Sequence, residues 1–231
     1  LHKTIFCFKE KLGNYICHKK ILMQNNSKII LGTAQFGNIY GFQKKFCGLK
    51  KSINIIDFAK KKGVKEIDTA LSYGNLVELS NSKLKGFKII LKININKDSI
   101  NNPKKNIIDE ILKTLLILKK KKIESLLIHN QDFLYFKKAK KIFKKINKLK
   151  QKKIINKIGI SVYDVDLIPY IIKNFKIDII QLPFNIIDQR INNTETLNLL
   201  KRKKIEIHIR SIFLQGLLLK SRIPNKFKRF S

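Results

Sequence analysis

Hydrophobic and polar positions divide most of the chain into two alternating kinds of segment. Short apolar runs, typical of buried strands, are followed by longer stretches in which apolar side chains recur every three or four positions, as in amphipathic helices. The short runs predict strands at residues 28–33, 65–68, 87–92, 123–128, 155–161, 177–182 and 205–210. The longer stretches predict helices at residues 51–62, 75–85, 104–121, 134–151, 164–174 and 193–203. Because strands and helices alternate, the pattern predicts an α/β protein with a parallel sheet.

Four polar residues lie at or just after the carboxyl ends of three successive predicted strands. Asp68 ends the strand at 65–68, Lys92 ends the strand at 87–92, and His129 directly follows the strand at 123–128. Tyr73 lies in the loop that Asp68 opens. Because parallel strands all point the same way, we expect these four side chains at one mouth of the sheet, where α/β barrels carry their chemistry.

A carboxylate, a phenol, an ammonium and an imidazole in one place suit the reduction of a carbonyl group. A free tyrosine has a pKa of about 10 and is a poor acid at neutral pH. The Lys92 ammonium would stabilise the phenolate of Tyr73 and lower its pKa, while Asp68 would keep the lysine charged and in position. His129 would direct a hydrogen bond at the carbonyl oxygen. The four residues therefore predict protonation of that oxygen by Tyr73 as a hydride reaches the carbon.

Structural roles compete with this interpretation for each residue taken singly. Lysine is so frequent, at 45 of 231 residues, that Lys92 alone carries little weight, whereas His129 is one of only four histidines. Asp68 could cap a helix and Tyr73 could be an ordinary loop aromatic. The order and combination of the four favour the catalytic interpretation.

Seven short motifs, spread over most of residues 28 to 219, carry a family resemblance. They read IILGTAQFG (29–37), DTA (68–70), YG (73–74), LIHN (127–130), IGISV (158–162), QLPFNIIDQR (181–190) and RSIFLQGLL (210–218). The ordered set resembles the aldo/keto reductase family. The last two motifs most resemble a bacterial branch associated with surface-glycan and sugar-nucleotide pathways.

The resemblance implies a (β/α)8 barrel of the TIM-barrel type that binds NADPH without a Rossmann domain, with NADH left open. The sequence agrees, since it contains neither a G-x-G-x-x-G motif after a predicted strand nor a phosphate-binding G-x-x-x-x-G-K-[ST] loop. By position, Ser161 and Gln181 would hold the nicotinamide carboxamide, and Arg210 and Ser211 would complete the cofactor site.

The chain departs from the family pattern at two positions of the expected cofactor site. Val162 stands where many members have asparagine, which removes one partner of the carboxamide. Arg210 stands where many members have an aromatic ring that stacks on the nicotinamide. A guanidinium plane can also stack, so the cofactor prediction survives this substitution.

The pattern supplies seven strands before the chain stops at Ser231, and a closed barrel needs eight. We therefore expect an incomplete, C-terminally truncated barrel in which the eighth βα unit is missing. The strands at 28–33 and 205–210 would then each keep an unpaired edge. Residues 1–22 are set apart as a leader or upstream segment, because the only methionine is Met23, and residues 23–231 are assigned to the partial barrel.

Composition adds limits on partners and location. The net charge of +34 arises because 50 basic residues outnumber 16 acidic ones. The basic residues are 45 lysines and only five arginines, a bias typical of AT-rich coding sequence, whereas nucleic-acid readers favour arginine. No dedicated nucleic-acid partner is therefore expected. The spacing of the three cysteines fits neither a disulfide framework nor a zinc site, so we expect no metal and a reducing, cytoplasmic location for Cys7, Cys17 and Cys47. No run of eighteen apolar residues occurs, so we expect no membrane span.

The favoured hypothesis is an NADPH-dependent oxidoreductase that reduces an aldehyde or ketone, sugar-derived compounds included, to an alcohol. A non-catalytic remnant of the same fold, acting as a binding subunit or pseudo-enzyme, is the alternative, and nucleotide binding separates the two. A basic nucleic-acid binder is a third hypothesis, which predicts steeply salt-dependent retention of DNA.

Overall fold

The computed structural model describes residues 2–6, 28–39, 47–74, 78–79, 83–97, 106–192 and 194–219. Its strands are β1 (His2–Phe6), β2 (Ile29–Gly32), β3 (Glu66–Ala70), β4 (Lys88–Ile93), β5 (Ile123–Ile128), β6 (Ile155–Ser161), β7 (Ile179–Pro183) and β8 (Glu206–Arg210). The α-helices are α1 (Ala34–Gly37), α2 (Leu49–Lys61), α5 (Ile107–Ile117), α6 (Ala139–Gln151), α7 (Ile168–Asn174) and α8 (Thr194–Arg202). Short 3-10 helices follow four strands: η3 (Leu71–Tyr73), η4 (Gln131–Tyr135), η5 (Val165–Leu167) and η6 (Leu214–Leu219).

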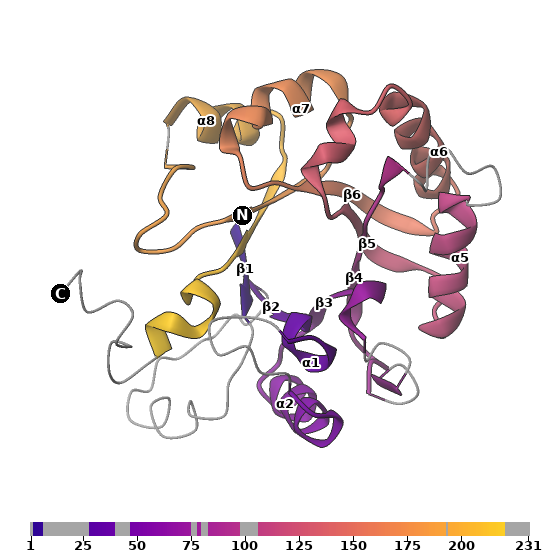
Figure 1. Cartoon of the computed structure of the whole chain (residues 1–231), viewed down its shortest axis with the longest axis vertical. Coiled ribbons are helices and arrows are strands. Elements are labelled where there is room, and N and C mark those ends of the chain that lie inside the picture. The colour runs from indigo at the N-terminus through magenta and orange to yellow at the C-terminus, as the bar shows by residue number, and fades with distance from the viewer. Residues whose placement is uncertain are drawn as a thin grey trace.

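The strands form a closed parallel barrel in the order β1 to β8, with the helices around its outside (Figure 1). The predicted (β/α)8 class is confirmed, and β2 to β8 are the seven strands that the sequence pattern predicts. Among the described residues, no further βα unit follows β8. The predicted helix at 75–85 lies mostly outside the described residues, and the other five predicted helices are present within a few residues of their predicted bounds.

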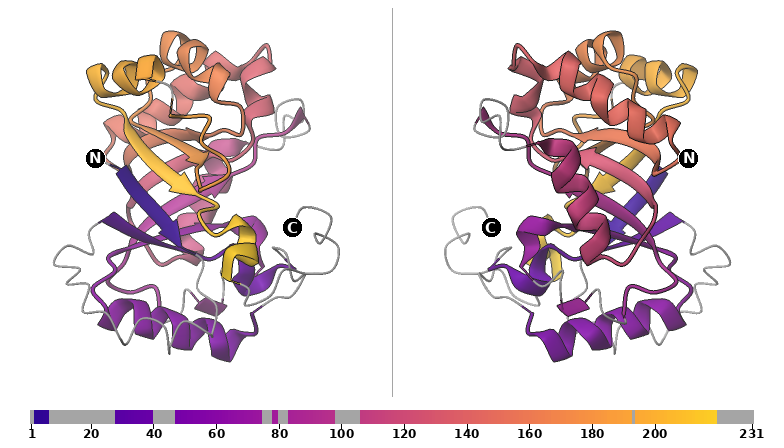
Figure 2. Two further views of the ribbon diagram at one scale, coloured as in Figure 1. Left: turned by 90° about the vertical axis from the view of Figure 1, so that its left-hand side faces the viewer. Right: turned by 90° about the vertical axis from the view of Figure 1, so that its right-hand side faces the viewer.

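The eighth position of the ring is filled by β1, which lies within the segment that the sequence sets apart. Its backbone pairs in parallel with β2, where Thr4 is opposite Ile29, and with β8, where Thr4 is opposite Ile209. Figure 2 shows β1 running beside β8 on one side of the barrel. The expectation of two unpaired edges at this place is therefore wrong. The five-residue run has too little alternation to be recognised as a strand, and its pairing is set by strands far along the chain.

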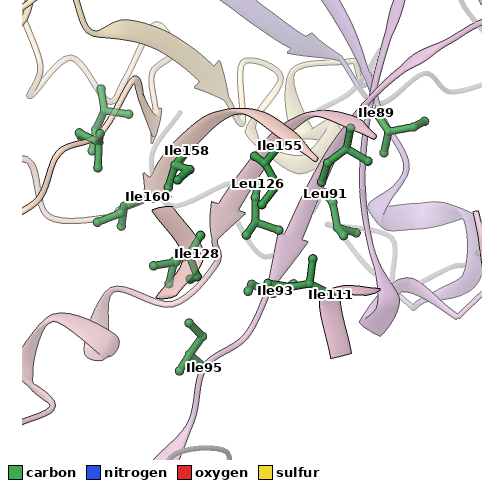
Figure 3. Packing of buried hydrophobic residues seen from close by; sticks show 14 of the residues in the cluster. Ile89, Leu91, Ile93, Ile95, Ile111, Leu126, Ile128, Ile155, Ile158 and Ile160 are labelled. Carbon is green, nitrogen blue, oxygen red and sulfur yellow. The ribbon is translucent and has the colours of Figure 1, made fainter. Parts of the chain in front are cut away.

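Alternation along each strand separates two hydrophobic cores. The larger core lies between the barrel and its helices, and Figure 3 shows Leu91 and Ile93 of β4 in it with Ile111 of α5. The smaller core lies inside the barrel and consists of Ile30, Ile90, Leu127 and Ile179. Because successive strand residues face opposite sides, Lys92 and Gln181 share the inward face with Ile90 and Ile179, two residues nearer the carboxyl ends of their strands.

Helix α6 illustrates how the sequence produces the outer layer. Ala139, Phe143, Ile146 and Leu149 recur at helical spacing and are buried, while the intervening lysines lie on the solvent side. At α5 the side chain of Asn106 caps the helix by accepting a hydrogen bond from the backbone N–H of Ile108 at 3.1 Å. In the described part of the chain, no helix has both the length and the apolar character needed to cross a membrane.

Candidate active site

The centre of the site is a buried ion pair between neighbouring strands β3 and β4. The Nζ atom of Lys92 lies 2.6 Å from Oδ1 of Asp68, and the two side chains are only 7% and 1% exposed. The other carboxylate oxygen, Oδ2, accepts a hydrogen bond of 2.8 Å from Nε2 of Gln181. Both oxygens of this buried carboxylate are therefore engaged, which is what removal of a charge from water requires.

The surroundings of Lys92 keep it protonated. Burial alone lowers the pKa of a lysine, but the charges of Asp68 and Tyr73 and the hydrogen bonds that Lys92 makes with both raise it. The net effect is a pKa of Lys92 above its ordinary value of 10.5. The site thus contains a fixed cation at neutral pH.

Tyr73 lies next to this cation. It is the last residue of η3, the residue is 9% exposed, and its ring centroid lies 5.3 Å from Nζ of Lys92. Gly74, which follows it, has φ of +79°, and a Cβ atom there would lie 3.0 Å from the backbone oxygen of Gly37. Only glycine fits this turn without strain, so the turn fixes where Tyr73 leaves η3.

His129 completes the group from the end of β5. Its ring is edge-on to the Tyr73 ring, with centroids 6.0 Å apart and planes at 82°. Burial, the nearby charge of Lys92 and, to a smaller extent, that of Arg210 lower the pKa of His129 to about 4, although Asp68 opposes the shift. His129 is therefore neutral at pH 7. Its Nδ1 atom has no hydrogen-bond partner among the described residues.

Asn130 anchors the backbone beside His129. Its side chain accepts a hydrogen bond from the backbone N–H of Ile95 and donates one to the Ile95 oxygen, both at 2.9 Å. The backbone N–H of His129 donates to the oxygen of Ile93 at 2.8 Å. These bonds continue the β4–β5 ladder past the strand ends, so His129 is held by a rigid frame.

A cavity of about 370 Å³ opens above these residues. Asp68, Tyr73, Lys92 and His129 all lie on its wall, so the structure brings together the four residues that the sequence predicts. Arg210 and Ser211 also lie on the wall, together with Tyr163. A phenol, an ammonium and a neutral imidazole therefore meet one space large enough for a small molecule.

The predicted cofactor residues divide into two groups. Arg210 and Ser211 reach the cavity, whereas Ser161 and Gln181 are buried side by side on β6 and β7, away from its wall. The guanidinium of Arg210 stacks on the ring of Tyr163, with its carbon 3.9 Å from the ring centroid, and donates to the backbone oxygen of Val162 at 3.1 Å. One face of the guanidinium plane is thus already covered by an aromatic ring.

Comparison with known families identifies the chain. The profile of the Aldo/keto reductase family matches residues 28–230. The chain belongs to the aldo/keto reductase family. A comparison with curated proteins gives no match.

Solved structures place this aldo/keto reductase in the same fold. An aldo-keto reductase from Bacillus halodurans in its holo form is 19% identical, with a TM-score of 0.65, over 84% of this chain and 65% of that chain. A glycerol dehydrogenase from Gluconobacter oxydans is 20% identical, with a TM-score of 0.63, over 87% and 65%. An aldo/keto reductase from Brucella melitensis is 18% identical, with a TM-score of 0.58, over 83% and 70%. The chain spans about two thirds of the length of these proteins.

Two supporting residues of this aldo/keto reductase escape sequence reasoning. Tyr163, which stacks on Arg210, is one, and Asn185 is another. The buried Asn185 side chain accepts hydrogen bonds from the backbone N–H groups of Ile187 and Asp188 at 2.9 Å and donates to the backbone oxygen of Ser211 at 3.3 Å. An asparagine that follows a strand signals such a turn, but its link to Ser211 depends on the barrel bringing β7 beside β8.

Proposed function

We propose that this protein reduces the carbonyl group of a small molecule to an alcohol with NADPH, and that Tyr73 donates the proton. The observation that carries the proposal is the Tyr73–Lys92–Asp68 arrangement: a phenol beside an ammonium that a buried carboxylate holds at 2.6 Å. A cation next to a phenol stabilises the phenolate and makes the phenol a better acid. Membership of the aldo/keto reductase family supports carbonyl reduction in general.

Each residue has a distinct role in the proposed reaction. Tyr73 gives its proton to the carbonyl oxygen, and Lys92 stabilises the phenolate that remains. Asp68 keeps Lys92 in place. His129, which is neutral at pH 7 because its pKa is about 4, orients the carbonyl by donating a hydrogen bond to its oxygen.

The residues present fit a nicotinamide cofactor. Oε1 of Gln181 is buried and has no hydrogen-bond partner among the described residues. An acceptor in that state suits an N–H donor such as that of a carboxamide. Arg210 and Ser211 would line the cofactor site from the cavity wall, and Gln181 and Ser161, which are buried behind that wall, are the carboxamide ligands that the family resemblance implies. When bound, the cofactor supplies the hydride.

The proposed substrates are aldehydes and ketones, with sugar-derived carbonyls of surface-glycan pathways as the first group to assay. A second cavity of about 640 Å³ adjoins Lys92, and its wall includes Ser72, Asn94 and Asn96. Amide and hydroxyl groups can both donate to and accept from the hydroxyls of a sugar. One of the similar structures, from Gluconobacter oxydans, is named a glycerol dehydrogenase, and glycerol is itself a polyol.

The test compares Tyr73→Phe with Tyr135→Phe, a change at a tyrosine that is 67% exposed and away from the site. NADPH binding is followed by its fluorescence, and turnover by NADPH oxidation with a panel of aldehydes and ketones. We expect Tyr73→Phe to lower turnover by about 10²- to 10⁴-fold without weakening NADPH binding, and Tyr135→Phe to change neither.

Two outcomes would contradict the proposal in different ways. Unchanged turnover in Tyr73→Phe would show that another group is the acid. Absence of both NADPH binding and carbonyl reduction in the unchanged chain would favour the non-catalytic alternative.

A further inference from the structure

Gln181 makes a contact that its expected role as a cofactor ligand does not require. Its Nε2 atom donates a hydrogen bond of 2.8 Å to Oδ2 of Asp68, a residue 113 positions earlier in the chain. In the ring of eight strands, β3 and β7 are opposite one another, so this bond crosses the interior of the barrel. Gln181 and Asp68 are 0% and 1% exposed, and the bond is therefore shielded from water.

The chemistry of the two groups fixes how the amide is oriented. Asp68 is already bound to Lys92 through Oδ1 and offers only acceptor oxygens. If the amide were reversed, the Gln181 oxygen would face a carboxylate oxygen at hydrogen-bond distance, which is repulsive. The nitrogen must therefore point to Asp68, and the oxygen of the amide is left as an acceptor.

We infer that Gln181 is a positioning residue that fixes the carboxylate plane of Asp68 and so keeps Oδ1 directed at Lys92. The inference rests on the proposed function and adds a second contact to the Asp68–Lys92 pair. With Lys92 alone, the carboxylate could rotate about its Cβ–Cγ bond, and Oδ2 would be buried without its donor. A buried acceptor that lacks a partner is costly, so the pair depends on Gln181.

Two substitutions at Gln181 separate this role from that of a simple cofactor ligand. Gln181→Met keeps the length of the side chain and removes both polar atoms. Gln181→Glu keeps the shape and makes the donor depend on pH, because a protonated carboxyl can donate to Asp68 and an ionised one cannot. Next to another buried carboxylate, the introduced carboxyl keeps its proton to a higher pH than it would in water. Gln189→Glu, at an exposed position, adds the same charge away from the site.

The pH dependence of kcat/KM is the first readout. We expect Gln181→Met to lower kcat/KM about 10- to 100-fold at every pH, the size expected for losing one hydrogen bond to a charged group. We expect Gln181→Glu to be near the unchanged chain at about pH 6 and to lose activity relative to it as the pH rises to about 9, with no such loss for Gln189→Glu. If Gln181 only accepts a bond from the cofactor, an ionised glutamate serves equally well, and Gln181→Glu would keep its activity at high pH. That result would overturn the inference.

A second readout needs no activity. The side-chain NH₂ resonances of Gln181, assigned by their loss in Gln181→Met, report its donor bond directly. Asp68→Asn replaces a charged acceptor by a neutral one, which weakens the bond. We expect these resonances to move towards the values of a free glutamine in Asp68→Asn and to stay in place in Asp166→Asn, at an exposed aspartate. If the resonances do not move in Asp68→Asn, the hydrogen bond is refuted, whether or not the chain reduces carbonyls. If they move but the chain shows no activity, the contact is supported and the proposed function fails.

Discussion

Replacing Lys92 by methionine should be far more costly to stability than replacing a paired lysine that is partly exposed. Lys92 and Asp68 form an ion pair of 2.6 Å in which the side chains are 7% and 1% exposed. The substitution removes the cation and leaves the carboxylate buried, with Gln181 as its remaining hydrogen-bond donor within the described part of the chain. Breaking a buried pair by removing one partner costs about 3–5 kcal/mol of unfolding free energy.

The matched control is Lys83→Met. Lys83 and Asp57 form a pair of 2.9 Å, but their side chains are 32% and 44% exposed, so water replaces the lost partner. Exposed pairs contribute about 0–1 kcal/mol. The double variant Lys92→Met with Asp68→Asn removes both buried charges. We expect it to recover part of the stability that Lys92→Met alone loses, so that the two substitutions are not additive.

The assay is urea unfolding followed by far-UV circular dichroism at several pH values. The pKa of Lys92 is raised above 10.5, so its contribution is fully present below 10.5 and is lost only as the pH rises through the folded-state value. The free-energy gap between the unchanged chain and Lys92→Met should therefore be flat, as far as Lys92 determines it, from about pH 7 to 9. Equal costs for Lys92→Met and Lys83→Met would refute the reasoning, as would strictly additive effects of Lys92→Met and Asp68→Asn.

Three further predictions concern the frame around the site. The pKa of His129 falls from 6.5 to about 4 on folding, so the free energy of unfolding should decrease as the pH drops between these values. Urea unfolding at pH 7 and pH 5 should show a smaller decrease for His129→Gln. Deleting residues 1–6 removes β1 and exposes the edges of β2 and β8. We expect a lower melting temperature, and dimers or aggregates in light scattering. A monomer with an unchanged melting temperature would contradict the closed ring. Gly159→Ala would place a Cβ atom 2.5 Å from the backbone oxygen of Ile179 and should lower the free energy of unfolding by about 1–3 kcal/mol, measured by thermal unfolding. Gly48→Ala is the control and should cost much less, because a Cβ atom there would meet nothing within 4 Å.

The sequence was sufficient to predict the strands and helices that follow a local rule. Runs such as 123–128 and 155–161 combine apolar residues with strand-like length, and their predicted bounds agree with β5 and β6. The same rule located Asp68, Lys92 and His129, because residues at the carboxyl ends of parallel strands must share one mouth. Local pattern therefore predicted the fold class and the meeting of the four residues on the cavity wall.

Features that depend on barrel closure lay beyond the sequence pattern. The contact between Gln181 and Asp68 joins opposite strands across the interior, and no periodicity along one strand encodes it. Gln181 was expected to face a cofactor, whereas its donor is directed at the carboxylate. Likewise, β1 is a strand because β2 and β8 are there to pair with it, since its own five residues show no strand period.

These two long-range features act on the same part of the molecule. Strands β3 to β7 form an unbroken arc, and the ring closes on the other side only through β8, β1 and β2. Without β1, the remaining arc runs from β2 to β8, and its two ends would be free to separate. The strands next to these ends are β3, which carries Asp68, and β7, which carries Gln181. The hydrogen bond of 2.8 Å between them spans the mouth that would open. Closure by β1 therefore bears on the position of Lys92, because the carboxylate that holds this lysine is itself held from the far side of the barrel.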